Sequence, residues 1–150
     1  PRVDLSGEDV RRKLLILARA SGLQLEARDI RVSSLVPDAL RDAAPGDVDA
    51  QLTTLDAPLR ERFLTAYRSD ARLCFVGRFD AGRGASVGLR ALPLSSPLAS
   101  GYGTENRAAI FSDRYRDRPL VIQGPGAGAE VTAAALLDDV LRITRAAAGA

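Results

Sequence analysis

The chain has no histidine and no methionine, and it has a single cysteine among 150 residues. Without histidine it offers neither a histidine base nor histidine ligands for a metal. Without methionine, Pro1 cannot be a translation start, so we expect the chain to be a piece of a longer protein or a processed product. Cys74 has no second cysteine for a disulfide or a metal site. We therefore expect no metal, and a reduced thiol in the core of a cytoplasmic protein.

Long hydrophobic runs and concentrated charge of one sign are also absent. No apolar run approaches the ~20 residues that a membrane-spanning helix needs, and no basic-then-apolar leader opens the chain. The net charge is only +2, and arginines alternate with acidic residues, as in residues 60–62 and 114–118. A nucleic-acid-binding surface would gather its basic residues on one element. We therefore expect a soluble protein that binds neither membrane nor nucleic acid.

Lysine is nearly absent, because only Lys13 among the 21 basic residues is a lysine. Arginine cannot lose its proton in a protein, whereas lysine can. Lys13 is therefore a candidate for proton chemistry, although one surviving lysine could also be a matter of chance.

Hydrophobic periodicity and turn residues predict one α+β domain over residues 1–150, without repeats. We expect helices packed on one face of a mixed, largely antiparallel sheet. Helices are predicted over 6–20, with Ser6 as N-cap and Gly22 at the end, over 47–68 with a break before Pro58, and over 129–146. Strands are predicted over 30–36, 73–80 and 85–92 (a hairpin), 107–115, and 120–122, the last of them buried.

The segment from Asp4 to Lys13 is the first candidate for chemistry. Asp9 and Lys13 are four residues apart and share a helix face. They could be an exposed ion pair worth ~0.3–0.5 kcal/mol beside a Ser6 cap, and spacing alone favours that interpretation. However, four apolar residues follow Lys13, so the helix is expected to be well buried and Lys13 to lie at the edge of the core. A lysine there is either paired or functional.

The segment from Leu120 to Leu141 is the second candidate. Gly124, Gly126 and Ala129 fit the pattern G-x-G-x-x-[G/A] between a strand and a helix, where backbone amides can meet an anion. No acidic residue follows ~20 positions later to bind a ribose, so this is not a complete dinucleotide-binding unit, and a glycine turn for tight packing is the alternative. The polar stretch 101–106 could line a site or form only a turn.

Three motifs resemble the homoserine dehydrogenase family. Residues 4–19 resemble its signature D-L-x-G-x-D-V-x-R-K-L-x-I-L-x-R, and residues 124–134 resemble its closing G-x-G-A-G-x-x-V-T-A-x. Residues 103–106 are similar to the segment before its dimer strand. The sequences of the first and middle segments are most similar to those of the bifunctional aspartokinase–homoserine dehydrogenases. The resemblance implies a fold like the C-terminal domain of glyceraldehyde-3-phosphate dehydrogenase.

The resemblance also implies an activity, the interconversion of L-homoserine and L-aspartate 4-semialdehyde with NADP or NAD, in threonine, methionine and isoleucine biosynthesis. It implies a homodimer or higher homo-oligomer formed through strands near residues 72–92 or 107–115. Carried over residue by residue, Lys13 is the proton donor and acceptor, Asp9 and Asp4 bind substrate, and Gly126, Gly128 and Thr132 contact the cofactor.

The chain also departs from the family pattern. The nucleotide-binding domain and a substrate-binding glutamate that precede this region in the family are not in the sequence, and Val3 stands where some members carry aspartate. We expect the cofactor to be held mainly by that other domain, to which residues 124–150 would return, and the 150 residues alone to be inactive. The rival hypothesis is a non-catalytic dimerisation or regulatory module that keeps the same fold.

Overall fold

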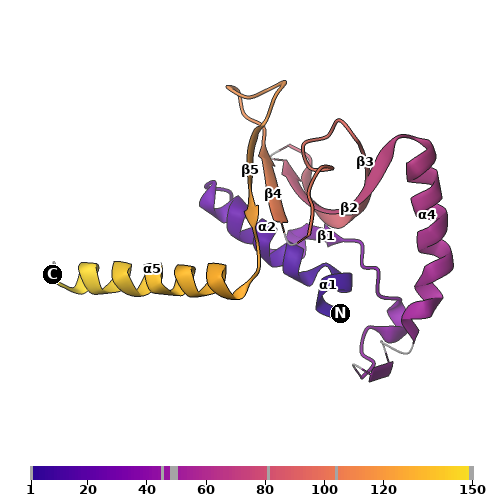
Figure 1. Ribbon diagram of the computed structural model, residues 1–150, viewed down its shortest axis with the longest axis horizontal. Helices are drawn as coiled ribbons and strands as arrows, with labels where there is room; N and C mark the ends of the chain where they lie inside the picture. Colours follow the sequence, from indigo (N-terminus) through magenta and orange to yellow (C-terminus); the bar gives the residue numbers. More distant parts are fainter. Residues whose placement is uncertain (1, 45, 48–50, 81, 104, 149–150) are drawn as a thin grey trace. The chain divides into compact units, whose positions relative to one another are not determined.

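The computed structural model describes residues 2–44, 46–47, 51–80, 82–103 and 105–148 (Figure 1). The contacts between these residues fall into two compact units, Pro1–Ser95 and Ser96–Ala150. The sequence pattern gives no sign of this division, and the two units are described separately below.

The N-terminal helical segment is split in two by Gly7. Helix α1 spans Arg2–Ser6 and α2 spans Glu8–Ala20. Gly7 has φ +82, and a Cβ there would come within 3.0 Å of the Phe75 ring, so both conformation and space demand glycine. The prediction of one helix with Ser6 as its N-cap is therefore wrong, because Ser6 ends α1 and donates its hydroxyl to the Val3 carbonyl at 2.8 Å. The predicted end is confirmed, since Gly22 follows α2 with φ +83.

The first unit contains a three-stranded mixed sheet in the order β1–β3–β2 (Figure 1). Strands β2 (Ala71–Asp80) and β3 (Gly84–Pro93) form the predicted antiparallel hairpin, and β1 (Ile30–Val32) runs parallel to β3. The α+β class is thus confirmed. Strand β1 is shorter than the predicted 30–36, because a turn follows it in which the Val36 amide bonds to Ser34 Oγ at 2.9 Å.

Helix α2 packs on this sheet and forms the main core. The buried residues of this core are Leu14, Ile30, Ala85 and Val87. Gly77 on β2 lets the helix approach, since a Cβ there would lie 3.0 Å from a Val10 methyl.

The first unit also contains short 3-10 turns and a further long helix. The turns are η1 (Ala27–Asp29), η2 (Asp38–Leu40) and η3 (Leu52–Leu55), and helix α4 (Asp56–Arg68) follows and contacts β2. The predicted break before Pro58 lies at the start of α4. Pro58 itself occupies the first turn of α4, where its missing N–H costs no intrahelical bond.

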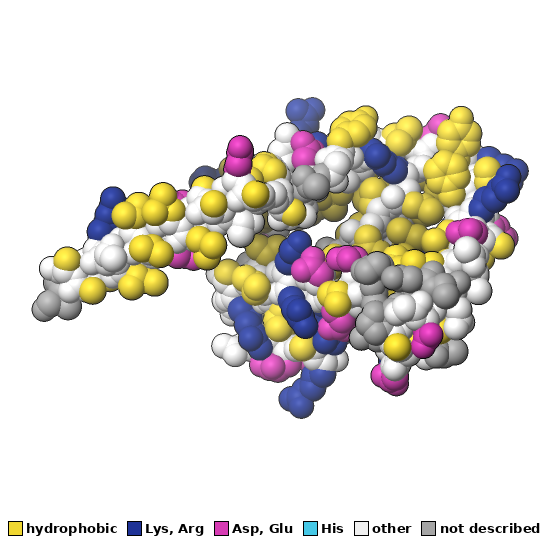
Figure 2. All heavy atoms as spheres, turned by 60° about the horizontal axis from the view of Figure 1, so that its bottom comes forward, with side chains coloured by type: hydrophobic (Ala, Val, Ile, Leu, Met, Phe, Trp, Pro, Cys, Tyr) yellow, Lys and Arg dark blue, Asp and Glu magenta, His cyan; other side chains and the backbone are white. Residues whose placement is uncertain are grey.

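The second unit consists of an antiparallel strand pair and a long helix. Strand β4 (Glu105–Ile110) pairs with β5 (Leu120–Pro125), and α5 spans Ala129–Ala148. The strand predicted at 120–122 is confirmed, but its predicted burial is wrong, because Ile122 is 57% exposed. Helix α5 has no buried residue in its unit, and hydrophobic side chains stand out along it (Figure 2).

Within the described residues, none of the helices combines the length and apolarity that crossing a membrane requires. The same residues include no group of three histidine, cysteine or acidic side chains that could hold a metal ion. Cys74 is partly buried on β2 and forms no disulfide. Burial raises the pKa of its thiol, and the nearby Arg72 opposes that shift.

Candidate functional site

Helix α2 brings Asp9 and Lys13 into contact. Nζ of Lys13 lies 2.9 Å from Oδ2 of Asp9, as the four-residue spacing predicts. The side chains are 51% and 45% exposed respectively. An ion pair this exposed adds at most ~1 kcal/mol to stability. Both groups are therefore open to a ligand while each fixes the direction of the other.

The pair lies on the side of α2 that faces away from the sheet. At about 100° per residue, Asp9, Lys13 and Ile16 project within about 60° of one another. Leu14 and Ala18, on the other side, are buried. Ile16 is 67% exposed and Leu17 is 50% exposed, so the prediction that α2 is well buried is wrong for this side of the helix. Lys13 does not lie at the edge of a core but beside two exposed apolar side chains.

Asp4, the second predicted substrate-binding residue, lies on α1 and is exposed. Its carbonyl accepts a hydrogen bond from the Gly7 amide at 3.2 Å. The left-handed turn at Gly7 therefore determines how Asp4 stands relative to Asp9.

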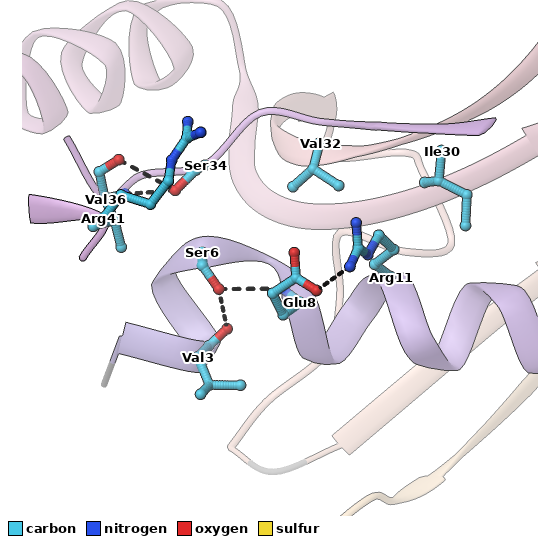
Figure 3. Close-up of a pocket in the computed structure, with 9 residues that line it drawn as sticks. All are labelled: Val3, Ser6, Glu8, Arg11, Ile30, Val32, Ser34, Val36 and Arg41. Atoms are coloured by element: carbon cyan, nitrogen blue, oxygen red, sulfur yellow. Dashed lines mark hydrogen bonds and ion pairs between the residues drawn. The ribbon is translucent and has the colours of Figure 1, made fainter. Parts of the chain in front are cut away.

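A cavity of about 540 Å³ lies beside the N-terminal helices and β1 (Figure 3), and neither Asp9 nor Lys13 lines it. Its polar side chains already have partners within the chain: Ser6 and Ser34 bond to nearby backbone, and Arg11 pairs with Glu8. The rest of the wall is largely valine and isoleucine. None of the predicted site residues lines this cavity, so we locate the candidate site on the exposed face of α2. The described residues that line it are Val3, Ser6, Glu8, Arg11, Ile30, Val32, Ser34, Val36 and Arg41.

The glycine segment of the second unit joins β5 to α5. Gly128 has φ +138 and directly precedes the helix, and its carbonyl accepts a hydrogen bond from the Thr132 amide at 3.1 Å. The structure thus brings Gly128 and Thr132 together in one helical turn. Among the residues that the structure describes, nothing lies within 4 Å of the position that a Cβ on Gly128 would occupy. The first amides of a helix have no partner within it, so this turn can receive an anionic group.

At Gly126 the constraint is a neighbouring side chain, which could not be foreseen from the sequence. A Cβ on Gly126 would overlap the side-chain amide of Asn106 on β4. The sequence marks Asn106 only as part of a polar turn. Its contact depends on the pairing of β4 with β5, in which Asn106 stands opposite Gly124.

The described residues form an α+β fold with an exposed lysine–carboxylate pair on one helix and, at its end, a strand–glycine–helix unit. Residues 1–141 match the sequence model of a family described as homoserine dehydrogenase. The chain belongs to the homoserine dehydrogenase family, which is a family of oxidoreductases, and the resemblance drawn from its motifs is confirmed.

Individual relatives agree with this assignment. The chain is 44% identical over 146 residues to bifunctional aspartokinase/homoserine dehydrogenase 1, chloroplastic, of Zea mays, covering 96% of the chain and 16% of that protein. It is 39% identical to homoserine dehydrogenase of Saccharomyces cerevisiae, covering 97% of the chain and 41% of the yeast protein. The chain therefore spans between about a sixth and two fifths of the length of these relatives.

Solved structures show the same fold. A Candida auris protein described as of unknown function matches with a TM-score of 0.85 and 38% identity, over 97% of this chain and 41% of that one. A putative homoserine dehydrogenase from Archaeoglobus fulgidus matches with a TM-score of 0.68 and 26% identity, over 95% of this chain and 37% of that one.

Proposed function

We propose that the chain is the substrate-binding and dimerisation part of a homoserine dehydrogenase that interconverts L-homoserine and L-aspartate 4-semialdehyde, with Lys13 as the proton donor and acceptor. The observation that carries this proposal is the pairing of the only lysine with Asp9 at 2.9 Å, on an exposed helix face. The family signature contains both residues.

Lys13 supplies the proton that the reaction requires. When a hydride adds to the aldehyde carbon, the carbonyl π electrons move to oxygen and leave an alkoxide. The Lys13 ammonium transfers one proton to that oxygen and becomes a neutral amine, and the hydroxyl of homoserine forms. In the opposite direction the neutral amine takes the hydroxyl proton as the hydride leaves carbon. General acid–base catalysis of this kind contributes ~10²–10⁴ in rate.

Asp9 orients Lys13 and binds the substrate. Its carboxylate accepts the bond from Nζ through Oδ2 and has further acceptor capacity for the substrate ammonium. Asp4, across the Gly7 turn, adds a second carboxylate on the same segment. Two carboxylates suit a substrate that carries a positive amino group.

NAD or NADP, when bound, supplies or accepts the hydride. The residues of the glycine segment fit such a group, because the space at Gly128 is open and the first turn of α5 faces it with backbone amides. We propose that Gly126, Gly128 and Thr132 contact the cofactor, and that a nucleotide-binding domain elsewhere in the intact protein holds most of it.

The exposed apolar side chains support a larger protein around this chain. Leu136, Leu137 and Ile143 on α5 are each more than half exposed. Exposed apolar surface of this kind marks an interaction site. We propose that residues 1–150 form one domain of a cytoplasmic enzyme, that segment 124–150 returns to the nucleotide-binding domain, and that the sheet strands form a homodimer or higher homo-oligomer.

The test uses the full-length protein that contains this segment. Lys13→Ala should lower kcat for homoserine oxidation by ~10²–10⁴. Lys13→Arg keeps the charge but cannot release its proton, so its loss should be of similar size. Arg28→Ala, which removes an exposed cation from the same unit, is the matched control and should leave kcat unchanged. A loss below about tenfold in both Lys13 variants would favour the non-catalytic module instead.

A further inference from the structure

In the second unit, the Asn106 side chain lies directly against the backbone of Gly126. The position that a Cβ on Gly126 would take is filled by the side-chain amide of Asn106. Gly126 does not have a positive φ, so its backbone conformation does not demand glycine. Gly128 shows the reverse, with φ +138 and open space around the missing Cβ. At Gly126, then, the end of the Asn106 side chain takes the space that a Cβ would need, whereas at Gly128 the positive φ of the turn favours glycine.

Asn106 reaches Gly126 from β4, a strand held by its pairing with β5 and by a hydrogen bond of the neighbouring Arg107 side chain. Within the β4–β5 ladder it stands opposite Gly124, two residues before Gly126. The next residue, Arg107, has a side chain only 15% exposed, and its Nη1 donates to the Pro97 carbonyl at 2.9 Å. The Asn106 side chain therefore extends from β4 to the glycine segment at the end of β5.

We infer that Asn106 is a positioning residue for the cofactor segment. By filling the space beside Gly126, its amide sets the direction in which the chain leaves β5, and hence where Gly128 and the first turn of α5 stand. This inference rests on the proposed cofactor role of Gly126, Gly128 and Thr132. It adds that their placement depends on a side chain outside the segment, which acts through packing and not through contact with the cofactor.

The first experiment measures steady-state kinetics of the full-length protein with NADP and NAD in separate series. Asn106→Gly should raise the cofactor KM by about tenfold or more, since hydrogen bonds to charged groups are worth ~1.5–3 kcal/mol and a displaced first turn of α5 would lose them. Its kcat at saturating cofactor should change by less than about threefold, because the proton-transfer residues are untouched. Asn106→Leu, which fills the same space without the amide, should restore the parent KM. A Leu variant as impaired as the Gly variant would overturn the packing role.

The second experiment needs no activity and so separates this inference from the proposed function. Thermal unfolding is measured for the parent, Gly126→Ala, Asn106→Gly and the double variant. Alanine at 126 should lower Tm in the parent, where it meets the Asn106 amide, and have little effect once position 106 is glycine. Changes in unfolding free energy that add within ~0.5 kcal/mol would show that the two positions are independent, and would refute the inference. Clear coupling together with an unaltered cofactor KM would leave Asn106 a purely structural residue, which also refutes the positioning role.

Discussion

Replacing Gly7 by alanine should destabilise the first unit far more than the same replacement at Gly22. Both glycines have nearly the same positive φ, +82 and +83. An L side chain in that region costs ~1–2 kcal/mol, partly offset by ~0.4–1 kcal/mol from the lower entropy of the unfolded chain. The conformational cost is therefore common to both variants, and it cancels in their comparison.

The packing cost applies to Gly7 alone. A Cβ at Gly7 would lie 3.0 Å from the Phe75 ring and 3.2 Å from a Val32 methyl, whereas at Gly22 no atom of the described part of the chain lies within 4 Å. Forcing an extra methyl into a packed core typically costs ~1–3 kcal/mol. Gly7→Ala should therefore lower the free energy of unfolding by ~1–3 kcal/mol more than Gly22→Ala.

Urea unfolding of the 150-residue chain, followed by circular dichroism, measures the difference. Equal losses for the two variants would show that the Phe75 ring does not restrict the side chain at position 7. In the full-length protein, Gly7→Ala should also raise the KM for homoserine, because the turn sets Asp4 relative to Asp9. Gly22→Ala, beyond the far end of α2, should leave that KM unchanged.

Three further predictions concern Asp9, Asp80 and the isolated chain. Asp9→Asn should raise the homoserine KM by about 10- to 100-fold, since hydrogen bonds to charged groups are worth ~1.5–3 kcal/mol; initial-rate kinetics would measure this, and an unchanged KM would remove Asp9 from the substrate site. The Gly82 amide, 3.0 Å from the Asp80 carboxylate, holds the pKa of Asp80 below its usual 3.8, and Arg78 lowers it further. The Asp80→Asn variant should therefore be less stable than the parent at pH 7. The difference in Tm between the two should close as the pH falls well below 3.8. The isolated 150 residues should show no homoserine-dependent NADP reduction, and a measurable rate would contradict the division of the cofactor site between two domains.

Local features of the fold could be read from the sequence because they depend on short-range geometry. The Asp9–Lys13 contact follows from helical spacing, and the β2–β3 hairpin follows from two strand-like runs around a glycine turn. The contact between Asn106 and Gly126 could not be foreseen. It depends on how two strands separated by a nine-residue connection align, and one residue of slippage would turn the Asn106 side chain to the other face.

Burial was harder to predict than secondary structure, and the reason is physical. Four apolar residues after Lys13 predict a buried helix, yet Ile16 is 67% exposed. Ile122 on β5 is 57% exposed for a segment predicted to be buried. Apolar composition favours a covered surface, but it does not say whether the cover comes from the same segment of chain.

The exposed apolar residues next to Lys13 bear directly on its proposed chemistry. A lysine that is half exposed beside Asp9 remains well hydrated, and water weakens the interactions that would stabilise a developing alkoxide. General acid catalysis gains most where water is excluded and the groups around the reacting oxygen are fixed. Ile16 and Leu17 provide an apolar border on which a second element can close. The catalytic environment of Lys13 is therefore expected to form only when that border is covered, so the residue can carry the chemistry without the isolated chain being active.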